Sequence, residues 1–333
     1  MIAWHRRADG KLLLPLRLVW NDDERRPRSP IRITLGLLVA LLFADFGRRI
    51  RPTPIPSDGP LAEALNGLVG GIPQAASIIL GVIIAVVLID RRRLTDLGVD
   101  LDSISGRRFA GGFVLGSGIP MLSFLIGLAT GYYAIVDFGM SGGPMSWMLI
   151  LIATGLSILL TVIAEEFLAR GYLITNVIEG LDGVPRIQRG GAAAAAIGVA
   201  SLFFFLTHSF RGQAFGWYAA GLAVPLGVAY VLSADLSLPV GIHFGVNLTG
   251  GLIGWQPIPL SVVQLSSSST IAATLVFPIE AALVQLVGAA MAVVILLWWF
   301  RAERGQLSVE SSLPNPTLRW QTGDSGWPLR RSA

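Results

Sequence analysis

The sequence has no cysteine at all. This absence excludes a thiol nucleophile, a zinc site built from thiolates and a fold held together by disulfides. Charged residues are also scarce, at 14% of the 333 residues, whereas a soluble domain carries about 25%. Apolar residues make up 53% of the chain, and the mean hydropathy is +0.66. The composition therefore predicts an integral membrane protein, with the lipid bilayer around most of the chain.

The basic residues do not form a stripe that could bind nucleic acid. The net charge of +4 and the pI near 9.9 would permit such binding. The arginines stand instead at the ends of apolar runs, where they orient a membrane protein. We therefore expect no nucleic-acid partner.

The first thirty residues do not fit a signal peptide. Their one apolar stretch, 12–18, is short, and Pro15 and Arg17 interrupt it. We expect residues 1–30 to form a basic cytoplasmic arm.

Eight apolar runs are long enough, or nearly so, to cross a bilayer, which takes about 20 residues of helix. The first run is the weakest, because it is short and contains Asp45. The pattern predicts an all-α fold, a polytopic transmembrane bundle of about eight helices over residues 31–300. A disordered cytoplasmic tail is expected at 301–333. The expected spans are 31–46, 68–89, 109–133, 147–169, 190–209, 214–233, 236–253 and 281–300.

The basic residues also predict an orientation. All but four of the 25 fall in segments on one side of the expected spans. By the positive-inside rule this distribution favours cytoplasmic N- and C-termini, and we expect the membrane to be the plasma (inner) membrane. The four exceptions are Arg48, Arg49, Arg51 and Arg211.

Two adjacent glutamates lie near the end of the fourth run. At about 100° per residue, Glu166 and Arg170 share a helix face and can pair, while Glu165 points about a quarter turn away. An ionisable group at a span centre costs about 2.5–3.5 kcal/mol on insertion scales, so it is usually functional. The alternative is a helix end at the membrane boundary, with Arg170 marking the cytoplasmic side. We favour a structural Glu166–Arg170 pair and a Glu165 that is free for chemistry.

Histidine is rare, and two of the three histidines, His208 and His243, fall in apolar runs. His243 and Asn247 are four residues apart and share a helix face. Gly241 and Gly245 form a ridge of small residues beside them, which lets another helix approach closely. Each of these polar residues has an ordinary structural alternative as a satisfied core residue.

The presence of Glu165 favours a functional role for these residues over a structural one. A glutamate and two histidines on three separate spans can form a buried site that activates water. We expect these groups to share a pocket beneath the cytoplasmic surface.

Three short motifs occur in a fixed order along the second half of the chain. They are Glu-Glu-x-x-x-Arg at Glu165, Glu166 and Arg170, Phe-x-x-x-His at Phe204 and His208, and His-x-x-x-Asn at His243 and Asn247. The set resembles the motifs of the CAAX protease and bacteriocin-processing family (CPBP or Abi), which includes type II CAAX prenyl endopeptidases. The resemblance covers about residues 149–249. It implies an eight-helix intramembrane endopeptidase whose substrate is a peptide or a membrane protein.

The resemblance also implies a role for each motif residue. Glu165 with His208 would activate the attacking water, and His243 with Asn247 would stabilise the oxyanion. Glu166 and Arg170 would hold the site together. A second version of the chemistry uses a divalent metal such as zinc on Glu165, His208 and His243, although the sequence has no His-Glu-x-x-His motif.

Two other classes of function remain compatible with the sequence. One is a non-catalytic scaffold, or a protein for self-immunity to bacteriocins, with the same fold. The other is a proton-coupled carrier, which would also need Glu165 and His208. A change such as Glu165→Gln separates a peptidase from a scaffold, and substrate flux without cleavage marks a carrier.

Overall fold

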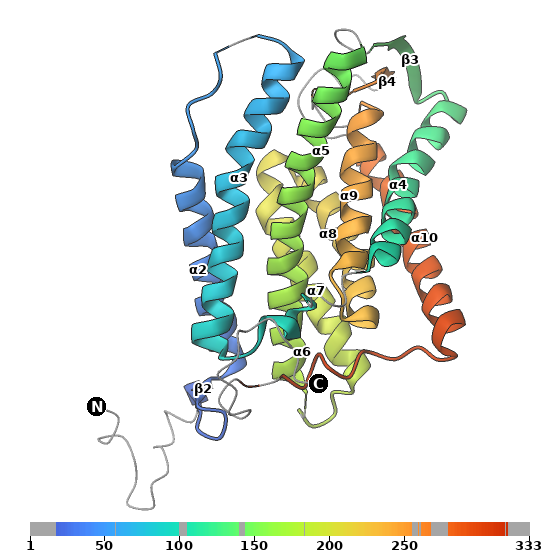
Figure 1. Cartoon of the computed structure of the whole chain (residues 1–333). Coiled ribbons are helices and arrows are strands. Elements are labelled where there is room, and N and C mark those ends of the chain that lie inside the picture. The colour runs from blue at the N-terminus through green and yellow to red at the C-terminus, as the bar shows by residue number, and fades with distance from the viewer. Residues whose placement is uncertain are drawn as a thin grey trace, which may run out of the picture.

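The computed structural model describes residues 18–56, 58–99, 105–139, 144–182, 184–254, 259, 261–267, 279–316 and 318. Over these residues the protein is a helical bundle, which confirms the predicted all-α polytopic fold (Figure 1). Seven of its helical segments are long and apolar enough to cross a membrane. They are Ser29–Arg49, Pro60–Asp90, Gly106–Ala129, Met145–Leu181, Arg189–Arg211, Gln213–Ser233 and Leu283–Arg304.

The elements follow one another along the chain in the expected order. The remaining expected span, 236–253, is helix α9 (Ser237–Leu252), which is only 16 residues long. The other elements are β1 (Trp20–Asn21), β2 (Arg26–Pro27), α2 (Ser29–Arg49), α3 (Pro60–Ile84), η2 (Ala85–Asp90), η3 (Leu94–Leu97), α4 (Gly106–Ala129), β3 (Tyr133–Phe138), α5 (Pro144–Glu166), η4 (Phe167–Ile174), α6 (Thr175–Leu181), α7 (Arg189–His208), η5 (Ser209–Arg211), α8 (Gln213–Ser233), β4 (Val263–Ser267) and α10 (Ile279–Arg304).

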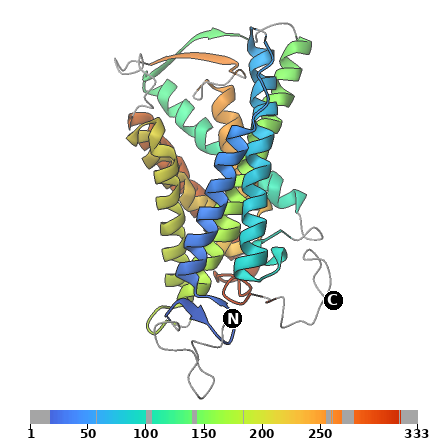
Figure 2. The same cartoon turned by 90° about the vertical axis from the view of Figure 1, so that its left-hand side faces the viewer.

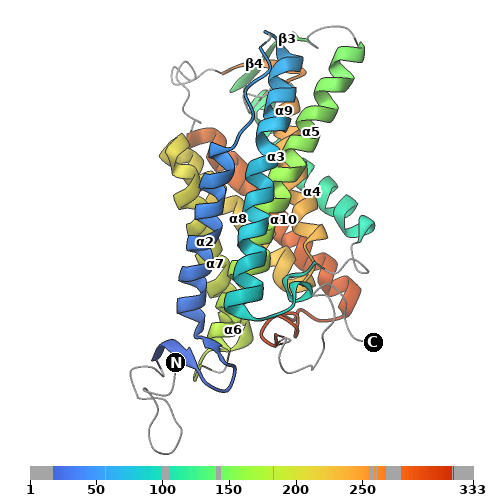
Figure 3. The same ribbon diagram turned by 60° about the vertical axis from the view of Figure 1, so that its left-hand side comes forward.

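Successive long helices run in alternating directions, which gives the bundle two distinct ends. One end holds the β1–β2 hairpin and the C-terminal end of α10, and we call it the hairpin end (Figure 1). The other is covered by strands β3 and β4, which pair antiparallel across the top of the bundle, and we call it the sheet end (Figure 2). Helices α2 and α3 lie side by side along one flank (Figure 3).

Glycines bring α4 and α9 into direct backbone contact. A Cβ on Gly116 would overlap the carbonyl oxygen of Ile242, and one on Gly245 would overlap that of Phe113. Gly241 makes the same kind of approach to Phe109. The predicted ridge of small residues on α9 is thereby confirmed, and α4 is the helix that packs on it.

The fourth span differs from its prediction. The predicted span ends at residue 169, and the alternative interpretation of Arg170 was a residue at the cytoplasmic boundary. Instead, α5, η4 and α6 form one continuous helical segment that reaches Leu181. Arg170 is completely buried inside it. The sequence misled here because a single arginine after an apolar run has the same pattern as a boundary residue.

Described residues of the expected arm and of the expected tail pack against the helical bundle. Arg26 in β2 is fully buried, and Leu313 and Leu318, beyond α10, are buried as well. The Glu310 N–H donates to the Val231 carbonyl at the end of α8. Residues 305–316 and Leu318 thus cover the hairpin end of the bundle. The remainder of the expected arm, 1–17, and of the expected tail, 319–333, lies outside the described residues.

Candidate active site

The centre of the site is a buried pair on one helix. Glu166 ends α5, and the wider turn of η4 follows it directly, a feature that often marks functional positions. The Arg170 Nη1 donates to Glu166 Oε1 at 2.8 Å, and both side chains are 0% exposed. Arg170 Nη2 also donates to the Ala223 carbonyl on α8 at 3.2 Å, and its guanidinium lies 4.4 Å from the centroid of the Phe204 ring. The predicted Glu166–Arg170 pair is therefore present, with contacts to α7 and α8.

His243 of α9 joins the two glutamates. Its Nδ1 lies 2.8 Å from Glu166 Oε1, the same oxygen that Arg170 holds. Because an ionised carboxylate only accepts, Nδ1 carries the proton and donates. Its Nε2 lies 3.7 Å from Glu165 Oε2. The imidazole therefore links the sealed carboxylate of Glu166 to the accessible carboxylate of Glu165, which is 29% exposed.

His208 ends α7 and is oriented by its own helix. Its Nδ1 lies 2.9 Å from the Phe204 carbonyl, which can only accept, so Nδ1 carries the proton. The ring stacks on Phe204, with centroids 5.2 Å apart and an interplanar angle of 15°. In this tautomer Nε2 has a free lone pair for accepting a hydrogen bond. Phe204 thus positions His208 on one side and contacts the Arg170 guanidinium on the other.

A cavity of about 480 Å³ brings the expected residues of the site together. Glu165, His208, His243 and Asn247 all line it. A water molecule takes up about 30 Å³ in the liquid, so the cavity has ample room for water and for part of a substrate. The structure places all four predicted residues around one space, with Glu166 and Arg170 sealed behind it.

The position of the cavity differs from the expectation. We expected a pocket beneath the cytoplasmic surface, and the orientation predicted from the arginines places that surface at the hairpin end. Leu181 lies sixteen helical residues after Glu165, or about 24 Å at 1.5 Å per residue. The exposed residues around the cavity are Leu41, Thr161, Arg48, Phe210 and Arg211, and the last three lie at the sheet-end termini of α2 and α7. The cavity therefore opens toward the sheet end.

A row of polar side chains on α5, which we call the polar stripe, lines this cavity and was not predicted from the sequence. Ser157, Thr161 and Glu165 are spaced four residues apart on α5, and all three line the cavity. Such spacing places them on one helix face, so the pattern could have been read from the sequence. From Glu165 the stripe extends along α5 toward the sheet end. Aromatic side chains of α7, η5 and α8 line the other wall, and they are Phe203, Phe204, Phe210, Phe215 and Tyr218.

The suggested metal ligands do not form a coordination site in this arrangement. Among the described residues, no three His, Asp or Glu side chains are grouped so that they could hold a metal ion. The set Glu165, His208 and His243 thus does not fit a metal here, and the chemistry below uses the side chains themselves.

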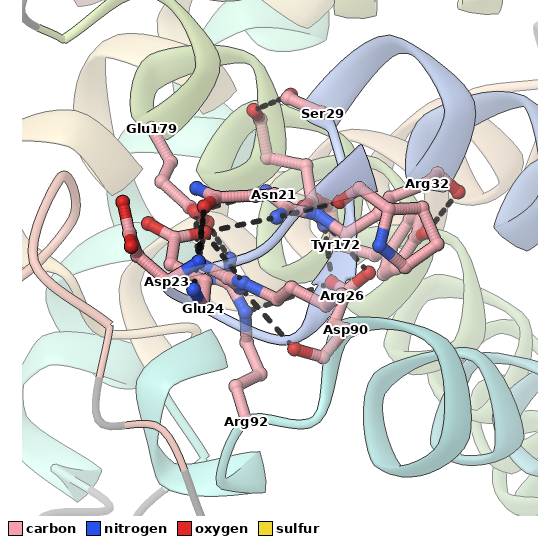
Figure 4. Close-up of polar contacts among 12 residues, drawn as sticks. Asn21, Asp23, Glu24, Arg26, Ser29, Arg32, Asp90, Arg92, Tyr172 and Glu179 are labelled. Carbon is pink, nitrogen blue, oxygen red and sulfur yellow. Dashed lines mark hydrogen bonds and ion pairs between the residues drawn. The ribbon is translucent and has the colours of Figure 1, made fainter. Parts of the chain in front are cut away.

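A second ionic group, which was also not predicted from the sequence, surrounds Glu179 of the same helical segment near the hairpin end. Glu179 of α6 accepts from Arg26 of the hairpin and from Arg92, and it lies 2.9 Å from Arg32 Nη2 (Figure 4). Asp90 lies 3.6 Å from Arg32 Nε and 3.5 Å from Arg92 Nε. We call these five residues the arginine cluster.

The arginine cluster is almost completely sealed from water. Its three arginines and Asp90 are 0–2% exposed, and Glu179 is 9% exposed. Burial would lower the pKa of Arg92, but the carboxylates of Glu179, Asp90 and Asp96 outweigh this effect and raise the pKa. Arg92 therefore stays charged. Sequence patterns could not reveal the cluster, because its five residues come from segments that are far apart in the sequence. Its arginines also have the same pattern as ordinary loop arginines.

Part of the chain is similar to a known protein family. Residues 144–249 match the model of a family described as type II CAAX prenyl endopeptidase Rce1-like. The matched segment runs from α5 through most of α9 and contains every motif residue. It confirms the resemblance and supports CAAX-type intramembrane protease activity. A search of curated proteins finds no match to the chain.

Proposed function

We propose that this protein is an intramembrane endopeptidase in which Glu165 and His208 activate a water molecule that hydrolyses a peptide bond. The observation that carries the proposal is the placement of Glu165. It is the one acidic residue among the described residues lining the cavity, and it is in reach of His243. A carboxylate open to water beside imidazoles has the composition of a general-base site.

The attacking water would lie between Glu165 and His208, which line the same cavity. The His208 Nε2 accepts a hydrogen bond from this water and orients it. Glu165 takes a proton as the water oxygen bonds to the carbonyl carbon of the substrate. General-base catalysis of this kind contributes about a hundredfold to ten-thousandfold in rate.

The proton then has a route to the leaving group. His243 Nε2 lies 3.7 Å from Glu165 Oε2, and its Nδ1–H is held by Glu166. When Nε2 receives the proton, it becomes a donor and can stabilise the oxyanion together with the amide of Asn247. The proton passes to the nitrogen of the leaving amine as the carbon–nitrogen bond breaks. One oxyanion donor is worth about 3–4 kcal/mol in a protease.

Glu166 and Arg170 would act by positioning. Glu166 Oε1 fixes the tautomer and the ring orientation of His243, and Arg170 forms a buried ion pair with the same carboxylate. The Ala223 carbonyl and the Phe204 ring hold Arg170 in turn. Groups from α7 and α8 thus hold Arg170, and Arg170 and Glu166 together hold the ring of His243.

The distribution of arginines supports an orientation for the molecule. We propose that the hairpin end faces the cytoplasm and that the membrane is the plasma (inner) membrane. The cavity would then open toward the outer side, and substrates would approach from there. The lack of cysteine makes a direct test available, since Asp137→Cys at the sheet end and Glu303→Cys at the hairpin end would each carry the sole thiol. In intact cells an impermeant maleimide should label only the Asp137→Cys protein, and the reverse pattern would invert the orientation.

The proposed activity can be tested with purified protein in detergent and a panel of fluorogenic peptides. The unmodified protein should cleave at least one peptide, with a product mass that shows hydrolysis. Glu165→Gln should lower the rate by about a hundredfold or more without lowering the melting temperature. Glu303→Gln makes the same change at an exposed site and should keep the full rate.

Two results would contradict the proposal. If the folded protein cleaves no peptide, a scaffold or carrier is favoured, and flux in sealed vesicles separates these two. If a chelator removes activity and zinc restores it, the side-chain mechanism is wrong. The proposal predicts that the rate in the presence of chelator stays unchanged.

A further inference from the structure

We propose that Arg48 and Arg211 bind a carboxylate of the peptide substrate at the sheet-end opening of the cavity. This inference rests on the proposed endopeptidase function and names a determinant of its specificity. Arg48 comes from the last turn of α2, and Arg211 comes from η5, after α7. These segments are far apart in the sequence, yet both arginines line the same cavity as Glu165.

The two arginines lie at the rim of the cavity and not in its depth. The Arg48 side chain is 57% exposed, and Phe210 next to Arg211 is 80% exposed. His243, by contrast, is only 5% exposed. A group bound by the arginines would therefore still reach solvent while the rest of a substrate extends inward to Glu165.

The positive charge of Arg48 is only weakly compensated. Asp45 is the nearby acid, and it lies 2.6 Å from Arg49 Nε but 3.4 Å from Arg48 Nη2. Asp45 is thus shared by Arg48 and by Arg49, and Arg49, the closer partner, does not line the cavity. One carboxylate balances only one of these two positive charges, so the pair keeps a net positive charge at the rim.

Arg211 is oriented by aromatic rings. Its guanidinium carbon lies 5.8 Å from the Phe210 centroid and 5.4 Å from the Phe215 centroid, within the range of cation–π contact. No ion pair to Arg211 occurs among the residues that the structure describes. Ring faces hold the planar group in place and leave its N–H edge free. That edge is the part of arginine that binds carboxylates in a bidentate way.

Membrane orientation does not explain these arginines, because they belong to the four basic residues on the sparsely charged side. Each of the other two has a local structural role there. Arg49 pairs with Asp45, and Arg51 Nε donates to the Gly70 carbonyl at 3.1 Å, which ties the α2–α3 connection to α3. Arg48 and Arg211 are the pair that borders the cavity.

A peptide carboxylate fits this opening better than the phosphate of a lipid. The polar stripe Ser157–Thr161 leads from the rim to Glu165 and offers hydroxyl groups along the path. A peptide backbone can hydrogen-bond with such a surface, whereas an acyl chain cannot. The bound anion and the scissile bond would then belong to one molecule, so the arginines would help to place the bond at Glu165.

The test is a binding measurement that does not need turnover. The Glu165→Gln protein is placed in phosphatidylcholine nanodiscs, and a pool of fluorescent eight-residue peptides is made with a free C-terminal carboxylate or with a C-terminal amide. The free-acid pool should bind about fivefold more tightly, and either Arg48→Gln or Arg211→Gln should remove this preference. Arg107→Gln, an equal charge change on an exposed residue at the other end of the bundle, should leave the preference intact.

The outcomes separate the inference from the function on which it rests. Equal binding of acid and amide, or an unchanged preference in both variants, would overturn the inference, even for a protein that cleaves peptides. A preference that vanishes when phosphatidylglycerol replaces half of the lipid would assign the arginines to lipid phosphate and would also overturn it. A clear acid preference in a protein without peptidase activity would support the inference and remove the proposed catalysis.

Discussion

One helical segment, Met145–Leu181, carries parts of two ionic groups that differ in their access to water. Near its middle, Glu165 borders a cavity and is 29% exposed. About 20 Å further along the helix, Glu179 is held by three arginines and is 9% exposed. Both carboxylates are ionisable groups within an apolar helix. The accessible one has room for a water molecule beside it, and the sealed one does not.

The difference lies in how completely each carboxylate is satisfied. Glu179 has direct partners from the hairpin, from α2 and from the segment after η2, so it ties three parts of the chain together. Among the described residues, Glu165 has an ion-pair contact with His243, at the longer distance of 3.7 Å. A fully paired charge is stable and inert, whereas a charge with free oxygens can accept a proton. This difference supports the proposed chemical role of Glu165 and favours a structural role for Glu179.

After Glu165, the largest effect on activity is expected at His208. In His208→Phe an aromatic ring remains but the acceptor nitrogen that orients the water is lost, so the cleavage rate should fall by about a hundredfold to ten-thousandfold. The melting temperature should hardly change, because the ring lies at a cavity surface. A large loss of stability with a normal rate per folded molecule would place His208 with the sealed group instead.

The largest effect on stability is expected at Glu179. In Glu179→Gln the three arginines keep only part of their compensation, which should cost about 3–5 kcal/mol, the usual range for breaking a buried ion pair. Thermal unfolding in detergent would show this as a clear fall in the melting temperature. Glu303→Gln is the control, since it removes an exposed carboxylate at the same end of the bundle. Equal melting temperatures for the two variants would remove the supporting role of the arginine cluster.

A smaller effect on both properties is expected at the contact between α4 and α9. In Gly116→Ala the new Cβ overlaps the carbonyl oxygen of Ile242, beside His243, whereas in Gly118→Ala it meets nothing within 4 Å. Overpacking of this kind costs about 1–3 kcal/mol. The displacement of α9 should also lower the cleavage rate, because small misplacements of catalytic groups are costly. If Gly118→Ala is as harmful as Gly116→Ala, the contact between α4 and α9 is not the cause, since alanine favours a helix more than glycine does.

The sequence predicted the accessible group much better than the sealed one. Glu165, His208 and His243 stood out because ionisable residues are rare in apolar spans, and their motif spacing fixed which helix faces they share. Glu179 and Arg26 are 153 residues apart and lie in segments of ordinary composition. Nothing local to either residue shows that they meet, because only the packing of α2, α3 and α6 brings them together.

Two features of the site depended on tertiary structure in the same way. Arg170 reads as a boundary residue until η4 and α6 are seen to continue the helix to Leu181. The direction in which the cavity opens follows from where α2 and α7 end relative to α5, and helix lengths alone do not reveal it. The polar stripe with Ser157 and Thr161 was visible in the spacing, but hydroxyl residues are common in membrane helices and carried no weight without the cavity.

The most direct test compares single-turnover cleavage by Glu165→Gln and by Glu179→Gln, at a temperature where both proteins are folded. With peptide and protein mixed at equal concentrations, Glu179→Gln should cleave at nearly the unmodified rate, and Glu165→Gln should cleave about a hundredfold or more slowly. Normal cleavage by the folded Glu165→Gln protein would contradict the assignment of water activation to the accessible carboxylate.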